Sequence, residues 1–275
     1  MDRYAVIGHP VAHSRSPFIH ERFAKQTSQS MSYARIEAGP AIFEKVVRHF
    51  FAQGGRGVNV TLPHKQTAAV LSDALTPRAR VAGAVNTLAL QPDGTLLGDN
   101  TDGPGLVRDL RVNLGIAIAG RRVLLLGAGG AARGVLAPLL GLQPAFLTLA
   151  NRTPERAREL AAAFATHGDC RGCGFEEVLD GPYDLVVNAT SASLAGESLP
   201  LARGTVGTHS VCYDMAYGPD DTPFVRWAQA QGATRTAMGL GMLVEQAAES
   251  FHLWRGVRPD TASVLAALKV ELRAA

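Results

Sequence analysis

The sequence predicts an α/β fold in two parts. Three observations support this: strand and helix patterns alternate over residues 4–62, the alternation restarts after residue 103 with a glycine-rich turn between a strand and a helix, and a long helical pattern follows the last strand. Strands that alternate with helices form sheets covered by helices. A chain of 275 residues is long enough for two domains of ordinary size.

The first part is expected to contain three strands separated by two helices. Apolar and β-branched runs predict the strands, and amphipathic spacing predicts the helices. Ser16 followed by Pro17 marks a helix start, with the serine hydroxyl at the N-cap and the proline as the first helical residue. The expected elements are strand 4–7, helix 16–26, strand 31–36, helix 40–53 and strand 57–62.

Ser14 and Ser16 lie where the first strand gives way to this helix. Unpaired N–H groups and the positive end of the helix dipole gather at such a place. Two hydroxyls beside them suit a carboxylate, whereas the simpler interpretation of Ser16 is a helix cap alone.

The third strand carries polar side chains on one face. Asn59 and Thr61 point the same way because strand residues alternate between faces. Pro63 ends the strand pairing, and Lys65 follows directly. Two hydrogen-bonding groups and an amine at one sheet edge indicate a pocket for a small hydroxylated molecule, with Lys65 as a candidate proton carrier. A strand end with a solvated lysine is the alternative.

A hairpin is expected next, after short helices at residues 64–71 and 76–81. Its arms are residues 84–90 and 95–100, joined by a Pro-Asp-Gly turn. Asn86 lies on the first arm. Asp102 lies just beyond the second arm, a position that allows its carboxylate to approach Lys65.

The second part begins with a dinucleotide-binding fingerprint. A helix over residues 106–114 precedes strand 121–126, the turn Gly127-Ala128-Gly129-Gly130-Ala131-Ala132, a helix to about residue 140 and strand 146–150. In this Gly-x-Gly-x-x-Ala motif, Gly127 permits the tight turn, Gly129 lets a pyrophosphate approach, and Ala132 lets helix and strand pack closely. The context predicts a Rossmann-type, doubly wound domain rather than a tight turn without a ligand.

The end of strand 146–150 selects the cofactor. NAD enzymes place an acidic residue there for the ribose hydroxyls, but the chain continues Asn151-Arg152-Thr153-Pro154-Glu155-Arg156. Arg152 and Arg156 bracket a helix start capped by Thr153, which suits a 2′-phosphate. The sequence therefore favours NADP over NAD. A solvated arginine-rich helix is the alternative, and Arg158 on the same helix is expected to be solvated.

Three more strands continue the doubly wound pattern, at residues 183–189, 210–215 and 233–237. Thr190 and Met215 lie at carboxyl ends of two of them, where ligands bind in such sheets. A long helix follows Met238 and Gly239 and runs to about residue 254, carrying Gln246. Pro259 is expected to open the final helix.

Composition places the chain among globular proteins. Hydrophobic residues make up 47% and charged residues 19%, and the net charge of +3 is scattered, which argues against a nucleic-acid partner. Three cysteines are too few for a disulfide framework, and Cys170-x-x-Cys173 lacks a second pair for zinc, so no metal is expected. Without a signal peptide or membrane segment, the expectation is a cytoplasmic protein. The sequence leaves open whether it is a monomer or a homodimer.

Taken in order, these motifs resemble those of the shikimate dehydrogenase family over nearly the whole chain. The segments that carry the resemblance are residues 8–10, 13–17, 59–65, 83–87, 100–103, 127–132, 151–153, 188–191, 213–215 with Tyr217, and 239–243 with Gln246.

The resemblance implies reversible NADPH-dependent reduction of 3-dehydroshikimate to shikimate, in chorismate and aromatic amino-acid biosynthesis. It implies a substrate domain of residues 1–102 with 242–275 and an NADP(H)-binding domain of residues 103–241. Lys65 and Asp102 would be the catalytic pair. The substrate would contact Ser14, Ser16, Asn59, Thr61, Lys65, Asn86, Asp102, Tyr217 and Gln246. The cofactor would contact Gly127, Ala128, Gly129, Gly130, Ala131, Asn151, Arg152, Thr153, Arg156, Thr190, Met215 and Gly239.

The sequence departs from the family pattern at two places, which bear on cofactor geometry. Pro77 stands where an acidic residue is common, and Ser193 stands near a usual glycine. Three alternatives compete with this interpretation: a quinate/shikimate dehydrogenase that accepts NAD, a non-catalytic regulator that senses shikimate or NADP, and the folate-linked methylene dehydrogenase group. The arginine pair argues against the first, Lys65 with Asp102 against the second, and the serine pair against the third.

Overall fold

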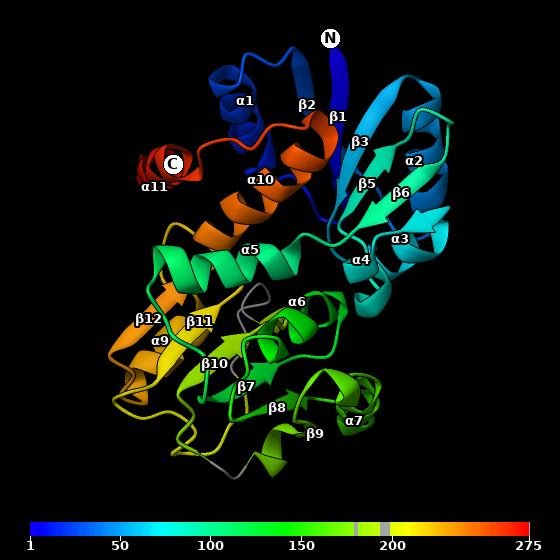
Figure 1. The fold of residues 1–275 in the computed structure, drawn as a ribbon. Coiled ribbons are helices and arrows are strands. Elements are labelled where there is room, and N and C mark those ends of the chain that lie inside the picture. The colour runs from blue at the N-terminus through cyan, green and yellow to red at the C-terminus, as the bar shows by residue number, and fades with distance from the viewer. Residues whose placement is uncertain (179–180, 193–198, 275) are drawn as a thin grey trace. The chain divides into compact units, whose positions relative to one another are not determined.

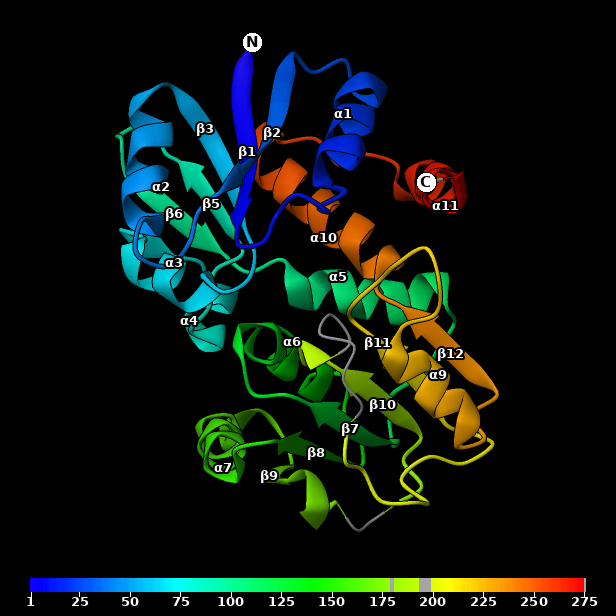
Figure 2. The same ribbon diagram turned by 180° about the vertical axis from the view of Figure 1, so that it is seen from behind.

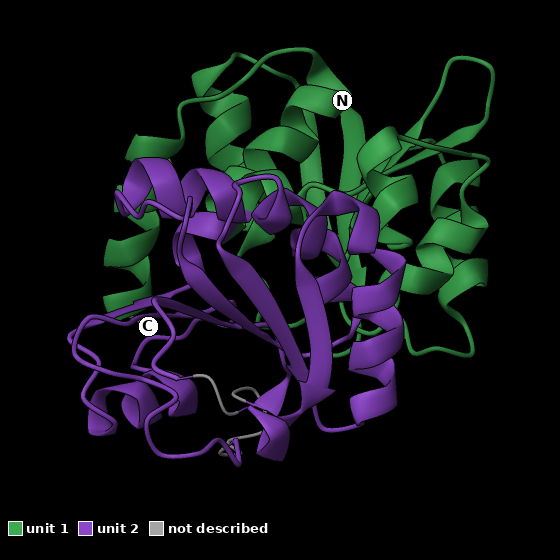
Figure 3. Cartoon of the chain, turned by 60° about the horizontal axis from the view of Figure 1, so that its bottom comes forward, with its two compact units in different colours: residues 1–105, 243–274 green, residues 106–242, 275 purple. Residues whose placement is uncertain are grey.

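The computed structural model describes residues 1–178, 181–192 and 199–274, so Ser193 lies outside the described residues. The chain divides into two compact units: residues 1–105 with 243–274 (unit 1) and residues 106–242 (unit 2). Figure 1 and Figure 2 show the ribbon from opposite sides, and Figure 3 colours the two units.

Unit 1 is built on a mixed sheet in the order β2-β1-β3-β5-β6-β4. The strand β1 (Asp2–Gly8) pairs in parallel with β2 (Met31–Glu37) and β3 (Gly55–Val60). The predicted antiparallel hairpin is present as β5 (Thr87–Leu90) and β6 (Leu96–Asp99), with the short β4 (Ala74–Leu75) beside β6. Because β3 pairs antiparallel with β5, Asn59 lies opposite Thr87.

Helices cover both faces of this sheet (Figure 1, Figure 2). On one face, α2 (Phe43–Ala52) and α3 (Lys65–Leu71) join a core that includes Phe50, Val58 and Val60. On the other lie α1 (Ser16–Gln26) and most of α10 (Leu240–Arg255), where His20 contacts Phe251. The remaining helices are α4 (Pro77–Ala82) and α11 (Thr261–Ala274). Strand alternation therefore turns Asn59 toward α10, away from that core.

Unit 2 contains the predicted doubly wound sheet, with all strands parallel in the order β12-β11-β10-β7-β8-β9. Numbered within the unit, this is the Rossmann order 3-2-1-4-5-6 read from β9. The strands are β7 (Arg122–Leu126), β8 (Phe146–Asn151), β9 (Cys170–Gly174), β10 (Leu185–Asn188), β11 (Val211–Asp214) and β12 (Arg235–Met238). The order reverses between β7 and β10, which is the place where such sheets bind ligands.

Both faces of the unit 2 sheet are covered, which explains its continuous apolar strands. Val123 and Leu125 of β7 pack in a core with residues of α6 (Gly130–Leu140) and α7 (Pro154–Ala163). Leu124 and Leu126 face a second core that includes residues of α9 (Pro223–Ala230).

The helix α5 (Asp102–Arg108) continues into a π-helical turn (Asp109–Asn113), and short 3₁₀ turns lie at Ala165–His167 and Phe175–Glu177.

Four predicted boundaries are wrong. The helix expected at Pro40 begins at Phe43 after a turn, and β3 ends at Val60 because the chain turns at Thr61. Pro259 does not open the final helix: the Asp260 carboxylate accepts hydrogen bonds from the N–H groups of residues 262 and 263, so α11 starts at Thr261. The helix expected at residues 106–114 starts earlier, at Asp102.

The Gly-rich segment with Cys170 and Cys173 forms the strand β9, which pairs with β8 and is not among the expected strands. Its glycine content has a packing reason, since a Cβ on Gly172 would lie 2.2 Å from the carbonyl oxygen of Ala157 in α7. Among the described residues no group of His, Cys, Asp or Glu side chains is arranged to hold a metal ion. None of the helices in residues 1–178, 181–192 and 199–274 combines the length and apolarity needed to cross a membrane.

Candidate active site

Lys65 and Asp102 form a largely buried ion pair in unit 1. Lys65 is the first residue of α3 and Asp102 the first of α5. The Lys65 Nζ atom lies 2.5 Å from Oδ2 of Asp102, and the two side chains are only 13% and 6% exposed. Each buried charge is therefore partnered, as burial requires. The approach expected from the hairpin is present, and it places an amine that can carry a proton against a carboxylate.

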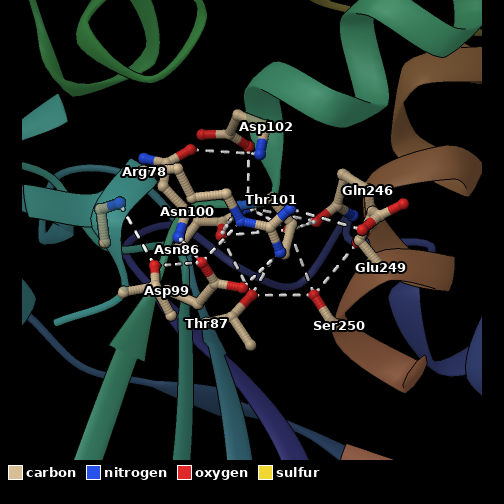
Figure 4. A network of polar contacts seen from close by, with 12 residues as sticks. Arg78, Asn86, Thr87, Asp99, Asn100, Thr101, Asp102, Gln246, Glu249 and Ser250 are labelled. Carbon is tan, nitrogen blue, oxygen red and sulfur yellow. Dashed lines mark hydrogen bonds and ion pairs between the residues drawn. The ribbon is translucent and has the colours of Figure 1, made fainter. Parts of the chain in front are cut away.

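Asn86 contacts Asp102 of this pair, and Gln246 lies beside Asn86 (Figure 4). The Asn86 Nδ2 atom donates to Oδ1 of Asp102 at 2.9 Å, while Oδ1 of Asn86 accepts the backbone N–H of Thr101 at 2.8 Å. The Gln246 Oε1 atom on α10 lies 3.3 Å from Asn86 Nδ2. Four of the predicted substrate residues thus come together at one place in unit 1.

Asn59 is also buried in unit 1. Its Oδ1 atom accepts the Tyr33 hydroxyl at 2.7 Å, and its Nδ2 atom donates to Ser250 Oγ at 2.9 Å and to Thr87 Oγ1 at 3.1 Å. The hydrogen-bonding capacity of the Asn59 amide is therefore directed into the protein.

The serine pair is also buried in unit 1, but Ser16 is not the helix cap that we predicted. Arg15 occupies the N-cap position, and Ser16 is the first helical residue. The Ser14 Oγ atom instead accepts the backbone N–H of Ser16 at 3.3 Å and donates to Ser16 Oγ at 3.2 Å. The Arg35 Nε atom donates to the Ser14 carbonyl at 2.7 Å and holds this turn in place. The Ser16 hydroxyl is thus not needed to cap the helix.

Tyr33 connects the serine pair with Asn59. Burial raises the pKa of Tyr33 well above its ordinary value, and a hydrogen bond with Ser16 opposes this rise. The phenol is therefore neutral and remains a donor to Asn59.

Thr61, the other predicted polar residue of the segment after β3, is partly buried, and its side chain lies where a Cβ on Gly8 would fall.

Arg78 and Asp99 brace the strand end that precedes Asp102 (Figure 4). Arg78 donates to both carboxylate oxygens of Asp99, at 2.5 and 2.7 Å, and reaches Glu249 of α10 at 3.4 Å. Although burial raises it, the pKa of Asp99 lies below its ordinary value because Arg78 and Thr76 hydrogen-bond to the carboxylate. Pro77, one of the two departures from the family pattern, is the exposed first residue of α4 beside this brace.

Several residues of this site were missed from the sequence: Tyr33, Arg78, Thr87, Asp99, Thr101 and Ser250. They belong to separate elements, and Ser250 contacts Asn59 across 191 positions of sequence. A signal was present for some of them. Thr87 and Thr101 adjoin predicted residues, and Ser250 lies one helical turn after Gln246.

The turn between β7 and α6 fits a pyrophosphate. Gly127 has φ +105°, and a Cβ there would lie 3.1 Å from the Ala189 carbonyl oxygen, so the fold itself requires glycine. Gly129 is different, because its φ is −85° and nothing lies within 4 Å of an added Cβ. No side chain caps the start of α6. The backbone N–H groups at the N-terminus of α6 are thus open to an anion. This segment includes the predicted residues Ala128, Gly130 and Ala131.

The end of β8 presents two exposed arginines. Arg152 and Arg156 flank the start of α7, and neither pairs with an acidic side chain in the described part of the chain. Thr153 holds the N-cap position, as predicted, but makes no side-chain cap bond, and Asn151 Nδ2 donates to the Thr153 carbonyl. Arg158, which we expected to be solvated, forms an exposed pair with Glu177 at 2.8 Å.

The other predicted cofactor residues, Thr190, Met215 and Gly239, follow the strands β10, β11 and β12. The Thr190 N–H and hydroxyl both donate to Asn188 Oδ1, at 3.1 and 2.7 Å. Gly239 follows β12, and a Cβ there would lie 2.3 Å from the Met215 carbonyl oxygen, so glycine is needed for close approach. Tyr217 is partly buried and belongs to unit 2, whereas the serines belong to unit 1.

Comparisons with known protein families and proteins point to the same family in each part of the chain. Residues 6–88 match a model described as the shikimate dehydrogenase substrate binding domain, residues 111–195 one described as shikimate / quinate 5-dehydrogenase, and residues 239–269 one described as the shikimate 5′-dehydrogenase C-terminal domain. A shikimate dehydrogenase (NADP(+)) of Aeromonas hydrophila is 57% identical over 272 residues, which cover 99% of both chains.

Solved structures agree as well. An Ael1 enzyme from Pseudomonas putida matches with a TM-score of 0.89 and 46% identity, covering 99% of this chain and 100% of that one. Shikimate 5-dehydrogenase from Thermus thermophilus, in complex with NADP(H) and shikimate, matches with a TM-score of 0.87 and 35% identity, again over 99% and 100% of the two chains. The chain therefore belongs to the shikimate dehydrogenase family.

Proposed function

We propose that this chain is an NADP-dependent oxidoreductase that reversibly reduces 3-dehydroshikimate to shikimate on the route to chorismate and the aromatic amino acids. The buried contact between Lys65 Nζ and Asp102 Oδ2, at 2.5 Å, carries the proposal. A partnered amine beside ring-binding polar groups is what reduction of a ketone requires, because the developing alkoxide needs a proton. The 57% identity to a shikimate dehydrogenase (NADP(+)), over 99% of both chains, supports the proposal.

When bound, NADPH supplies the hydride for the carbonyl carbon. Lys65 Nζ donates a proton to the carbonyl oxygen, and in the reverse direction the neutral amine takes the hydroxyl proton back. Asp102 orients the amine through the contact at 2.5 Å. Ser14 and Ser16 would hold the substrate carboxylate, with Tyr217 near it. Thr61, Asn86 and Gln246 would hold ring hydroxyls, as the family resemblance implies.

We further propose that residues 1–102 with 242–275 bind the substrate and that residues 103–241 bind NADP(H). The pyrophosphate would lie at Gly127, Ala128, Gly129, Gly130 and Ala131, with Thr190, Met215 and Gly239 along the crevice. Arg152 and Arg156 would bind the 2′-phosphate, next to Asn151 and Thr153. The absence of an acidic residue at the end of β8 supports NADP over NAD.

One assay tests the proposal. The full-length protein is supplied with shikimate or quinate and with NADP or NAD at equal concentrations, and the nicotinamide absorbance is followed. We expect rapid reduction of NADP with shikimate. Rapid turnover of quinate with NAD would favour the quinate/shikimate alternative, and no turnover of either acid would overturn the proposal. We expect small-molecule partners only and a cytoplasmic location. We also expect a monomer or a homodimer, and sedimentation of the purified protein would distinguish these two states.

A further inference from the structure

A series of hydrogen bonds runs through unit 1 from Tyr33 to the acid–base pair. Its members are Tyr33, Asn59, Thr87, Asn86 and Asp102, and we call it the Tyr33–Asp102 network. Successive donor–acceptor distances are 2.7, 3.1, 3.0 and 2.9 Å. Lys65 meets the far side of Asp102 at 2.5 Å. The network therefore ends on the carboxylate that holds the proposed proton carrier.

The orientation of the Asn59 amide is fixed by its neighbours. Its Nδ2 atom lies 3.3 Å from the backbone carbonyl of Asn86, which can only accept. The Oδ1 atom must then be the acceptor for the Tyr33 hydroxyl. The Tyr33 ring is itself held by a stacked contact with His20, with ring centroids 4.3 Å apart and planes within 6°.

The orientation of the Asn86 amide is fixed in the same way. Its Oδ1 atom accepts the backbone N–H of Thr101 at 2.8 Å, and a backbone N–H can only donate. The Nδ2 atom is therefore the one that faces Asp102 Oδ1. With Oδ1 occupied by this donor, the Asp102 carboxylate presents Oδ2 to Lys65.

Thr87 joins the two amides. Its hydroxyl accepts from Asn59 Nδ2 at 3.1 Å and donates to Asn86 Oδ1 at 3.0 Å. Ser250 of α10 lies 2.8 Å from the same hydroxyl (Figure 4). Thr87 is fully buried, so water has no ready access to replace a lost hydroxyl. Hydrogen bonds in such a series polarise one another in a low dielectric, and a buried gap leaves polar groups unsatisfied.

We propose that Thr87 and Tyr33 are positioning residues for the Lys65–Asp102 pair. They act through Asn59 and Asn86, which set the rotation of the Asp102 carboxylate. In this scheme Asn59, whose amide is engaged within the protein, acts through Thr87 rather than on a ring hydroxyl. The inference rests on the proposed function, since it assigns a role in that reaction.

The decisive variants are Thr87→Val, which keeps the shape but removes the hydroxyl, and Thr87→Ser, which keeps the hydroxyl. We expect kcat for shikimate oxidation to fall about tenfold or more in Thr87→Val, because a small misplacement of reacting groups is costly. KM for shikimate should change less than kcat. In Thr87→Ser, kcat should stay within about threefold of the wild-type value.

Two controls separate positioning from folding. Thr148→Val removes another fully buried strand threonine hydroxyl, which lies 3.0 Å from the Tyr183 hydroxyl in unit 2. It should lower the melting temperature without lowering kcat. Tyr33→Phe should lower kcat less than Thr87→Val does. Tyr4 contacts the Trp254 ring, as Tyr33 does, but lies outside the network, so Tyr4→Phe should leave kcat unchanged. Rates are expressed per NADPH-binding site, so that loss of folded protein does not count as loss of kcat.

The outcomes are distinguishable. Wild-type kcat in Thr87→Val, or a raised KM with unchanged kcat, overturns the inference while the proposed function stands. An equal loss in Thr87→Val and Thr87→Ser also overturns it, because the hydroxyl would then not be the cause. Absence of shikimate-dependent NADP reduction by the wild-type protein overturns the proposed function itself.

Discussion

Lys65 and Asp102 meet at 2.5 Å although 37 positions of sequence separate them. This contact predicts the behaviour of the Lys65→Ala variant. Without the amine, the alkoxide has no positioned proton donor, so turnover should fall about 10²–10⁴-fold. Binding of shikimate should change modestly, because the ring and carboxylate contacts remain. Steady-state kinetics and a binding titration measure the two effects. Lys25→Ala, at an exposed position of α1, is the control, and wild-type turnover in Lys65→Ala would remove Lys65 from the mechanism.

Removal of Arg152 and Arg156 should change cofactor preference. Charge-assisted bonds to a phosphate are strong, so the double Ala variant should raise KM for NADP about tenfold or more while KM for NAD changes little. Initial rates with each cofactor test this. Arg158→Ala, on the same helix but paired with Glu177, should leave both KM values unchanged. An equal loss in all of these variants would point to damage to α7 rather than to a phosphate site.

Gly129 and Gly127 should respond differently to alanine. Gly129 has a negative φ and open space beside it, so Gly129→Ala should keep the melting temperature of the wild type. The added methyl should instead obstruct the cofactor and raise KM for NADPH severalfold. Gly127→Ala should lower stability by about 1–3 kcal/mol, because φ is +105° and a Cβ would crowd Ala189. Thermal melts of both variants, with and without NADPH, make the comparison. A Gly129→Ala protein with normal NADPH affinity would argue against the pyrophosphate placement.

His20 should make unit 1 sensitive to acid. Both ring nitrogens are buried and make no hydrogen bond of good geometry among the described residues. Burial lowers the pKa of His20 to about 3, although the neighbouring Asn59 side chain opposes this fall. The unfolded chain takes up a proton near pH 6.5, whereas the folded chain does not until about pH 3. Stability from the neutral ring is thus complete above the unfolded pKa and is lost as the pH falls between these values, on the order of 1 kcal/mol per pH unit.

Denaturant unfolding of His20→Phe and of the wild type across this pH range measures the effect. The Phe variant should lose part of the slope, whereas His49→Phe, at an exposed position, should keep it. Parallel slopes in the wild type and His20→Phe would mean that the imidazole is not kept neutral.

Arg78→Met should destabilise unit 1. Asp99 is fully buried, and removal of its partner leaves an uncompensated charge. Breaking a buried pair costs about 3–5 kcal/mol, and the lower end applies because the Arg78 side chain is 36% exposed. Denaturant unfolding measures the cost, with Arg80→Met on the same helix as an exposed control. Similar stability of both variants would show that Asp99 tolerates the loss of its partner.

Local patterns predicted much of the fold because each depends on few neighbouring residues. The βαβ alternation, the hairpin at Pro92-Asp93-Gly94 and the turn at Gly127 were all readable, since turn chemistry and strand periodicity act over a few positions. The start of the final helix was misplaced because Asp260, not Pro259, lies at its N-cap. The strand β9 has no β-branched residue, and it forms because it pairs with β8 and packs closely against α7.

The candidate site was predictable only in part, for a related reason. Lys65, Asn86 and Asp102 lie just before or just after strands of one sheet. Residues in such positions come close together at the edge of the sheet, so their sequence positions were informative. Tyr33 and Ser250 lie on β2 and α10, and no sequence spacing reveals that both bond to Asn59. The cap assigned to Ser16 failed because the helix begins at Ser16 itself, whose backbone N–H donates to Ser14 Oγ.

The division of the chain has a consequence for its synthesis. Unit 2 is one continuous segment, whereas unit 1 needs residues 243–274 in addition to residues 1–105. Domains tend to fold as they emerge from the ribosome, the N-terminal parts first. Here one hydrogen-bond partner of Asn59 comes late, because Ser250 is translated 191 residues after it. The residues around Asn59 and Asn86 therefore lack their α10 partners while unit 2 is made, and the proposed catalytic centre is completed only after α10 has been synthesised.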